Sequence, residues 1–242
     1  MERLTLMVVE NILRLPALWL KLCRHAKRPD KYPEIVRYRN IQYAFQLAIK
    51  AGNIDFQVFG KENIPTDKPY MMYPNHQGKF DPMAIVAGCD VPMGVIMKKE
   101  LVSHPVLRRI MEATRSFGMD RENVRQSLTV INAVIEQLKL GRNYVIFPEG
   151  EANRHTNEVG AFHSGSFRCA TKTRCTVIPV ALINCFKPLD YPGTDPVAVQ
   201  VHYLKPIPYE EYQGMNTTGL AALVRKRIIE AIALHCPECD KG

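Results

Sequence analysis

The sequence predicts an α/β fold in which helices cover a mostly parallel or mixed central sheet. Three observations support this prediction. A chain of 242 residues is long enough for one large domain with a buried core. Hydrophobic residues make up 46% and charged residues 23%, which is typical of folded proteins and excludes disordered or collagen-like chains. From residue 53 onward, short strand patterns alternate with helical patterns.

Residues 53–242 are expected to form one domain, because the alternation continues without an internal repeat or a low-complexity segment. The strands are expected at 54–59, 70–73, 93–97, 116–119, 144–147, 176–182 and 197–204. The helices are expected at 80–88, 106–113, 123–140, 164–172 and 220–234. The helix at 123–140 has the clearest pattern, with apolar residues along one side and Gly141 as its stop signal.

Residues 1–52 are expected to form two amphipathic helices, over about 4–24 and 34–50, with a kink at Pro16. The apolar stretch from Leu4 to Leu22 contains charged residues and a proline, so we expect it not to span a membrane. It does not look like a signal peptide either, because its basic residues follow the apolar stretch. Two interpretations remain: a hairpin that packs on the rest of the protein, or an anchor that lies in the membrane interface with Trp19 at the boundary.

The chain carries a formal charge of +8, with 32 basic against 24 acidic residues. Residues 1–40 contain nine Lys or Arg against four acidic residues. This surplus favours an anionic partner, such as a phosphorylated metabolite, an anionic membrane surface or a nucleic acid. We expect no nucleic-acid partner, because the basic residues do not form a recognisable binding module with aromatic residues. Seven scattered cysteines, an odd number, indicate a reduced, intracellular protein.

His76 and Asp81 lie five positions apart, just beyond the expected strand 70–73. In open α/β sheets, functional sites form at the carboxyl ends of strands. A histidine held by a carboxylate has a fixed tautomer and a higher basicity, so it can accept a proton from a hydroxyl that attacks a carbonyl. The pair alone leaves a structural alternative open, in which Asp81 caps the helix that starts at Pro82.

Further motifs follow in order along the chain. Arg121 follows the expected strand at 116–119, and the sequence Phe-Pro-Glu-Gly at 147–150 closes a buried apolar strand. An Phe-x-x-Gly-x-Phe segment at 162–167 enters a helix, and a strand with an internal proline lies at 177–180. Together with Asn75–Asp81, which reads NHxxxxD, these blocks resemble the PlsC-type glycerolipid acyltransferases over about residues 55–205. This is the family of the 1-acyl-sn-glycerol-3-phosphate acyltransferases.

The resemblance implies an enzyme of phospholipid biosynthesis. It would transfer a fatty acyl group from a thioester, acyl-CoA or acyl-carrier protein, to the free hydroxyl of a lysophosphatidate-like acceptor, with no cofactor. His76 would be the general base, and Asp81 would orient it. The resemblance implies that substrate-binding residues near the acceptor phosphate are Lys98, Arg121, Glu149, Gly150 and Arg154. It also favours the membrane interpretation of residues 1–50, and a peripheral position on the cytoplasmic face of a membrane.

Three departures from the family pattern concern the acceptor. The family often has Ser where this chain has Gly78, and Thr-Arg-Ser where this chain has Glu-Ala-Asn at 151–153. A glycine of the second block is replaced by Arg115. These differences motivate two alternatives: an acyltransferase for another lysophospholipid acceptor, and a non-catalytic protein that binds membrane lipids.

No metal site is expected. His104, His155 and His163 could be combined with His76 and Glu149, but no HxH or HExxH pairing supports a site. Cys236 and Cys239 have a suggestive spacing but lack two further ligands. The sequence around Ser164 and Ser166 is not a GxSxG nucleophile elbow, so a serine hydrolase is not expected.

Overall fold

Seven strands form one mixed sheet, and the computed structural model describes residues 2–153 and 155–236 of the chain. The strands are β1 (Ile54–Phe59), β2 (Tyr70–Pro74), β3 (Gly94–Lys98), β4 (Phe117–Met119), β5 (Tyr144–Ile146), β6 (Thr176–Ile183) and β7 (Val197–Tyr203). Their spatial order is β1-β7-β6-β2-β5-β3-β4. The five strands from β2 to β6 run parallel, β7 is antiparallel to β6, and β1 is parallel to β7. The predicted α/β fold with a mixed sheet is confirmed.

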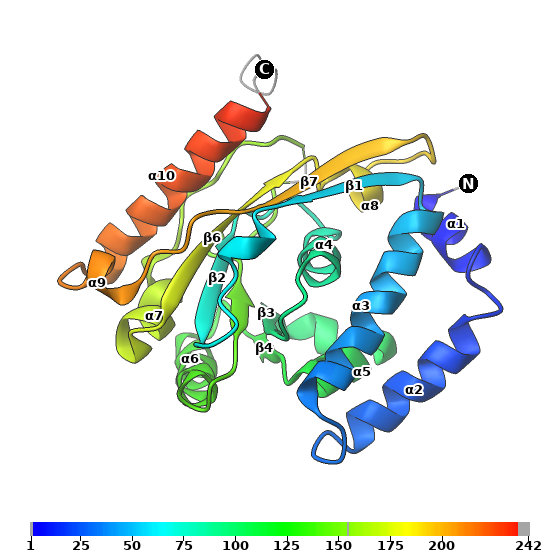
Figure 1. Ribbon diagram of the computed structural model, residues 1–242, viewed down its shortest axis with the longest axis horizontal. Coiled ribbons are helices and arrows are strands. Elements are labelled where there is room, and N and C mark those ends of the chain that lie inside the picture. The colour runs from blue at the N-terminus through cyan, green and yellow to red at the C-terminus, as the bar shows by residue number, and fades with distance from the viewer. Residues whose placement is uncertain (1, 154, 237–242) are drawn as a thin grey trace.

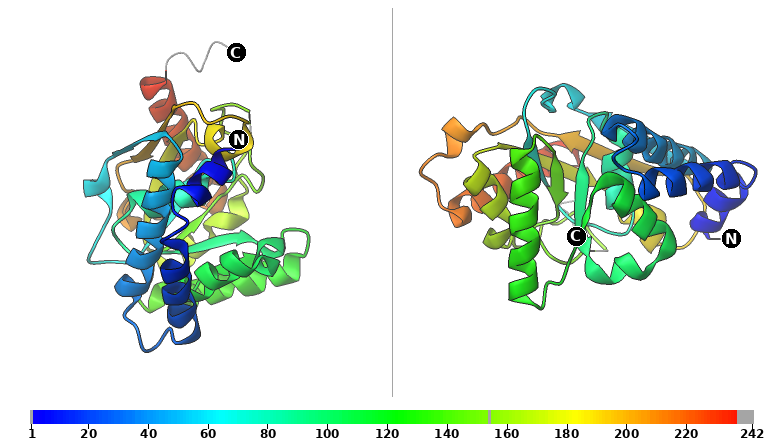
Figure 2. Two further views of the ribbon diagram at one scale, coloured as in Figure 1. Left: turned by 90° about the vertical axis from the view of Figure 1, so that its right-hand side faces the viewer. Right: turned by 90° about the horizontal axis from the view of Figure 1, so that it is seen from below.

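Helices cover both faces of the sheet (Figures 1 and 2). One face carries α3 (Glu34–Ala51), α4 (Asp81–Gly88) and α5 (Pro105–Thr114), and the other carries α6 (Val124–Lys139), α7 (Arg168–Thr173) and α10 (Thr217–His235). The predicted helix at 164–172 is found as a short helix η3 (Ser164–Phe167) that runs into α7. Other short helices were not predicted from the sequence: η1 (Lys61–Asn63), η2 (Lys99–Ser103), α8 (Lys187–Asp190) and α9 (Tyr209–Tyr212). Segments of three to five residues are too short to show a helical period.

Two apolar cores lie on the two faces of the sheet, because successive side chains of a strand point to opposite sides. On β2, Tyr70 and Met72 belong to the core beside α3 and α4, whereas Met71 and Tyr73 belong to the core beside α6, α7 and α10. All four side chains are fully buried. This double burial explains why the central strands appear in the sequence as continuous apolar runs.

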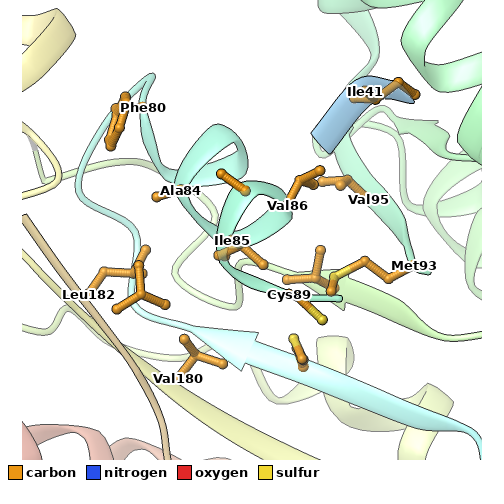
Figure 3. Close-up of a cluster of buried hydrophobic side chains, with 14 of the residues drawn as sticks. Ile41, Phe80, Ala84, Ile85, Val86, Cys89, Met93, Val95, Val180 and Leu182 are labelled. Atoms are coloured by element: carbon orange, nitrogen blue, oxygen red, sulfur yellow. The ribbon is translucent and has the colours of Figure 1, made fainter. Parts of the chain in front are cut away.

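Helix α4 is packed on two sides, and this matters for the site because the helix begins at Asp81. Figure 3 shows Ile85 and Cys89 directed toward the sheet and Val86 directed toward Val95 and Ile41. Contacts with both the sheet and α3 therefore hold α4, whose first residue is Asp81, in place.

The N-terminal region contains three helices, and the predicted kink at Pro16 is wrong. A first helix α1 (Arg3–Val9) ends before a turn over residues 10–14, and a separate helix α2 (Leu15–Lys27) follows. Pro16 lies in the first turn of α2, where its missing N–H needs no partner. Helices α2 and α3 lie side by side as a hairpin (Figure 1).

Helix α3 is part of the main core even though it precedes residue 53. Tyr38 and Ile41 are buried in the same apolar core as strands β2 and β6. The guanidinium of Arg37 donates a hydrogen bond to the carbonyl of Ala113, and Gln42 Nε2 donates one to the carbonyl of Cys89 over 2.8 Å. The packing interpretation of the hairpin therefore holds for the buried side of α3.

We expect Ile41→Ala to lower the free energy of unfolding by about 2–5 kcal/mol, because it leaves a cavity between α3 and α4. Ile41 is 3% exposed, whereas Val36 on the same helix is 45% exposed. Val36→Ala is the matched control and should change stability by less than about 1 kcal/mol. Urea unfolding of both variants measures the difference, and equal effects would contradict the assignment of α3 to the main core.

Candidate active site

The predicted site residues gather at the carboxyl edge of the parallel strands. His76 follows β2, Glu149 follows β5, Lys98 ends β3 and Arg121 follows β4. Because β2, β5, β3 and β4 are consecutive in the sheet and parallel, their carboxyl ends lie along one edge. Open α/β sheets place their functional sites at this edge.

His76 and Asp81 form a direct hydrogen bond. Nδ1 of His76 lies 2.7 Å from Oδ2 of Asp81. The histidine side chain is 17% exposed, and the aspartate side chain is fully buried. The ring of His76 also lies against Phe147, with 4.3 Å between the ring centroids. With Nδ1 directed at a carboxylate, Nε2 is the nitrogen left to exchange a proton with a substrate.

Asp81 is the centre of a small hydrogen-bond network. Its Oδ2 also accepts the backbone N–H of Gln77 over 2.6 Å and that of Gly78 over 2.9 Å. Its Oδ1 is buried without a hydrogen-bond partner among the described residues. Burial raises the pKa of Asp81, and the hydrogen bonds from His76, Gly78 and Gln77 oppose that rise.

The capping alternative for Asp81 is not observed. Phe80 is the N-cap of α4 and Asp81 is its first helical residue. No side-chain hydrogen bond caps this helix. The carboxylate of Asp81 instead faces the preceding loop.

Glu149 supports the same loop from β5. Its Oε1 accepts the backbone N–H of His76 over 2.8 Å, and its Oε2 accepts the backbone N–H of Gly160 over 3.0 Å. Burial raises the pKa of Glu149, and these two hydrogen bonds oppose the rise. Both carboxylate oxygens thus hold backbone, so Glu149 shapes the site by fixing the segments that carry His76 and Gly160.

Two buried residues beside His76, Asn75 and Gln77, hold the loop in place by hydrogen bonds that were not predicted from the sequence. Asn75 pairs with Leu182 of β6: its Nδ2 donates to the Leu182 carbonyl over 3.0 Å, and its Oδ1 accepts the Leu182 N–H over 2.7 Å. Gln77 accepts the N–H of Cys185 over 2.7 Å and donates to Oδ1 of Asn157 over 2.7 Å. A polar residue on either side of the histidine was the available signal, but its partners lie far away in the sequence.

Gly150 has a backbone requirement of its own. Its φ is +80°, a left-handed conformation that favours glycine. A Cβ at this position would lie 3.1 Å from the ring of His163. This explains the glycine of the 147–150 motif by conformation and close approach, and leaves its predicted contact with substrate as a prediction.

The predicted phosphate-binding cations are placed differently. Lys98 and Arg121 are both exposed and lie at the ends of the neighbouring strands β3 and β4. Partial desolvation lowers the pKa of Arg121, and the nearby carboxylates of Glu151 and Glu100 oppose this shift. Neighbouring Lys99 is engaged by Asp120 in an ion pair. Arg154 lies outside the described residues.

Within residues 2–153 and 155–236, no group of three or more His, Cys, Asp or Glu side chains is arranged to hold a metal ion. His155 Nδ1 lies 3.3 Å from the hydroxyl of Tyr191, and His163 packs against Gly150. Cys239 lies outside the described residues.

We expect Glu149→Gln to lower the free energy of unfolding by about 1–3 kcal/mol, because an amide NH₂ would face a backbone N–H that now has an acceptor. The pKa of Glu149 is higher in the folded than in the unfolded protein, so the folded protein binds this proton more tightly. The free energy of unfolding therefore falls as the pH rises from the ordinary carboxyl value of about 4.3 through the raised value. Glutamine does not titrate, so Glu149→Gln should remove this decrease in the free energy of unfolding.

The control is Glu158→Gln, a change at an exposed position of the following loop. Denaturant unfolding between about pH 4 and 8 measures all three proteins. Identical pH profiles for the wild type and Glu149→Gln would contradict the interpretation.

Comparison with known proteins agrees with this geometry. The sequence model of the acyltransferase family matches residues 55–183, more than half of the chain. A 1-acyl-sn-glycerol-3-phosphate acyltransferase of Borreliella burgdorferi is 25% identical over 192 residues, which cover 77% of this chain and 75% of the relative. The enzyme of that name from Saccharomyces cerevisiae is 27% identical over 186 residues, which cover 74% of this chain and 60% of the relative.

The fold has a close counterpart among solved structures. The crystal structure of the 1-acyl-sn-glycerophosphate acyltransferase PlsC from Thermotoga maritima superimposes with a TM-score of 0.69. The match covers 81% of this chain and 80% of that one, at 24% sequence identity. The match to the family's sequence model spans β1 to β6 and includes both members of the His76–Asp81 pair, so the chain belongs to the acyltransferase family.

Proposed function

We propose that the protein transfers a fatty acyl group from a thioester donor to the free hydroxyl of lysophosphatidate, a step of phospholipid biosynthesis. The observation that carries the proposal is the 2.7 Å contact between His76 Nδ1 and Asp81 Oδ2 at the carboxyl edge of the sheet. The relatives from Borreliella and Saccharomyces, both named 1-acyl-sn-glycerol-3-phosphate acyltransferases, support the choice of acceptor.

The geometry implies direct transfer. Oδ2 of Asp81 accepts a hydrogen bond from Nδ1–H of His76, which leaves the lone pair of Nε2 free to take the proton of the acceptor hydroxyl. The hydroxyl oxygen forms a bond to the thioester carbonyl carbon, and the carbon–sulfur bond then breaks. The proton passes from Nε2 to the departing sulfur, so His76 returns to its neutral state. An ester and a free thiol are the products, and no acyl-enzyme or cofactor is needed.

The acceptor phosphate would meet the cations at the carboxyl ends of β3 and β4. Lys98 and Arg121 supply two exposed positive charges on neighbouring strands, at the edge where His76 lies. Arginine binds phosphate through paired N–H donors, and lysine binds it as a point charge. Glu149 and Gly150 would act by shaping the adjoining loop. A phosphate contact by Arg154 stays a prediction.

We also propose that α1 and α2 rest on the cytoplasmic face of a membrane. The helices and the turn between them expose eight large apolar side chains: Leu4, Val8, Val9, Ile12, Leu13, Leu15, Trp19 and Leu20. Each buried CH₂ group contributes about 0.8 kcal/mol, so bulk lipid retains both the acyl chains and the product strongly. A site beside the membrane surface avoids extracting them. In the part of the chain that the structure describes, no helix has the length and apolar content needed to cross a membrane.

His76→Ala should lower the rate of acyl transfer by about 100- to 10,000-fold, because the acceptor hydroxyl loses its general base. The assay supplies lysophosphatidate and a labelled acyl-CoA and identifies the product. His104→Ala, at an exposed histidine before α5, is the matched control and should keep the wild-type rate.

Retained transfer in His76→Ala would overturn the proposed mechanism. An acceptor panel in the same assay tests the alternative acceptor. Preference for a lysophospholipid with a larger headgroup would move the assignment there, and a wild-type protein that binds lipid without any transfer would make it a binding protein.

Replacing Leu13 and Leu20 by Glu should weaken binding to anionic vesicles by about tenfold or more, because two apolar side chains that would enter the interface become charged. Leu13 is 93% exposed, so the fold should tolerate the change. Vesicle flotation measures binding. Leu234→Glu, at a 74% exposed leucine near the end of α10, is the control, and equal loss in both would contradict the membrane role of α1 and α2.

A further inference from the structure

Three consecutive backbone amides in the loop between His76 and α4, those of residues 77–79, donate hydrogen bonds to two buried carboxylates. The N–H groups of Gln77 and Gly78 donate to Oδ2 of Asp81. The next amide, that of Lys79, donates to Oδ2 of Asp190 over 2.9 Å. The loop between His76 and α4 is therefore held by one carboxylate from α4 and by a second one from α8.

Asp190 has a buried side chain although it belongs to a helix of only four residues. It ends α8, which follows β6 at the carboxyl edge of the sheet. Its side chain is 3% exposed, and its Oδ1 lies 3.5 Å from Nζ of Lys79. Burying a carboxylate costs free energy unless hydrogen bonds replace its lost hydration. The carboxylate of Asp190 therefore has to stay close to its donor in the loop, the Lys79 N–H.

Gly78 fits this carboxylate and would not fit it with a side chain. A Cβ at position 78 would lie 2.2 Å from Oδ2 of Asp190 and 3.2 Å from Cα of Phe186. The first distance is too short for any contact, so either the loop or Asp190 would have to move. The carboxylate of Asp190 thus occupies the space that a side chain at position 78 would need.

We propose that Asp190 is a positioning residue for acyl transfer and that Gly78 and Asp190 act as one unit. This inference rests on the proposed function, because its effect reaches the reaction through His76. Asp190 fixes the backbone at residues 78 and 79, the Gly78 N–H then meets Oδ2 of Asp81, and Asp81 orients His76.

A displacement of a reacting group by about 1 Å can reduce a rate about 100-fold. We therefore expect Asp190→Ala and Gly78→Ala each to lower kcat by about 10- to 100-fold, while the KM for lysophosphatidate changes by less than about threefold. The first variant removes the acceptor of the Lys79 N–H, and the second forces a methyl group against the carboxylate.

The decisive experiment is the double variant Gly78→Ala with Asp190→Ala. Removing the carboxylate makes room for the added methyl group, so the double variant should have about the kcat of Asp190→Ala alone. If Gly78 and Asp190 acted independently, the two losses would multiply instead, and that outcome would overturn the proposal.

Asp190→Asn tests the hydrogen bond, because an amide oxygen can still accept the Lys79 N–H; it should recover kcat to within about fivefold of the wild type. Glu230→Ala removes an exposed carboxylate that pairs with Lys226 over 3.7 Å on α10, and should leave kcat unchanged. Thermal unfolding accompanies each assay, and rates are compared per folded protein.

A variant Asp190→Ala that is folded and has the wild-type kcat would overturn the inference while leaving the proposed function intact. The proposed function fails by a different result, a wild-type protein that transfers no acyl group from the labelled acyl-CoA to lysophosphatidate. The two failures are therefore distinguishable in one set of assays.

Discussion

The site depends on one buried oxygen atom, Oδ2 of Asp81, which has to collect hydrogen bonds because water cannot reach it. It accepts three: one from Nδ1 of His76 and two from the amides of Gln77 and Gly78. An unpaired carboxylate in this position would be strongly destabilising. The loop after β2 folds back over the oxygen to supply these donors, and this same folding directs the ring of His76.

The surrounding structure keeps that loop in place by hydrogen bonds to its backbone and by buried side chains. Glu149 holds the N–H of His76 from β5, and Asn75 ties the loop to Leu182 of β6. Asp190 holds the N–H of Lys79 from α8. A reacting group is positioned accurately when its supports are themselves locked by packing. Here the supports come from strands and helices that are buried in two apolar cores, one on each face of the sheet.

In the proposed reaction, the charged surface residues would bind the acceptor phosphate and the apolar surface residues would contact the membrane. Lys98 and Arg121 lie at the same edge of the sheet as His76, and we propose that the acceptor phosphate binds there. The exposed apolar side chains of α1 and α2 would meet the lipid from which acceptor and donor chains come. Helix α3 connects the N-terminal helices to the α/β core. It packs against α2, and it shares an apolar core with α4 and the sheet.

The sequence by itself predicted the strands, the longer helices of the α/β domain, the contact between His76 and Asp81, and the family, because these depend on patterns over short distances. Strand and helix periods predicted every strand to within one residue at each end, and the five-residue spacing predicted the contact of His76 with Asp81. Pro16 shows the limit of local patterns, since a proline indicates a break without saying whether a helix kinks or restarts there.

Only the tertiary structure decided which distant groups meet. Glu149 was predicted from its motif, but its two amide partners depend on how β5 lies beside β2. Asp190 carried no signal, because it ends a four-residue helix and lies 111 residues from its partner Lys79. A buried carboxylate needs donors, but the path of the whole chain decides which donors reach it. The sequence therefore specified the chemistry of the pair, and the packing of β5, β6 and α8 around it specified its geometry.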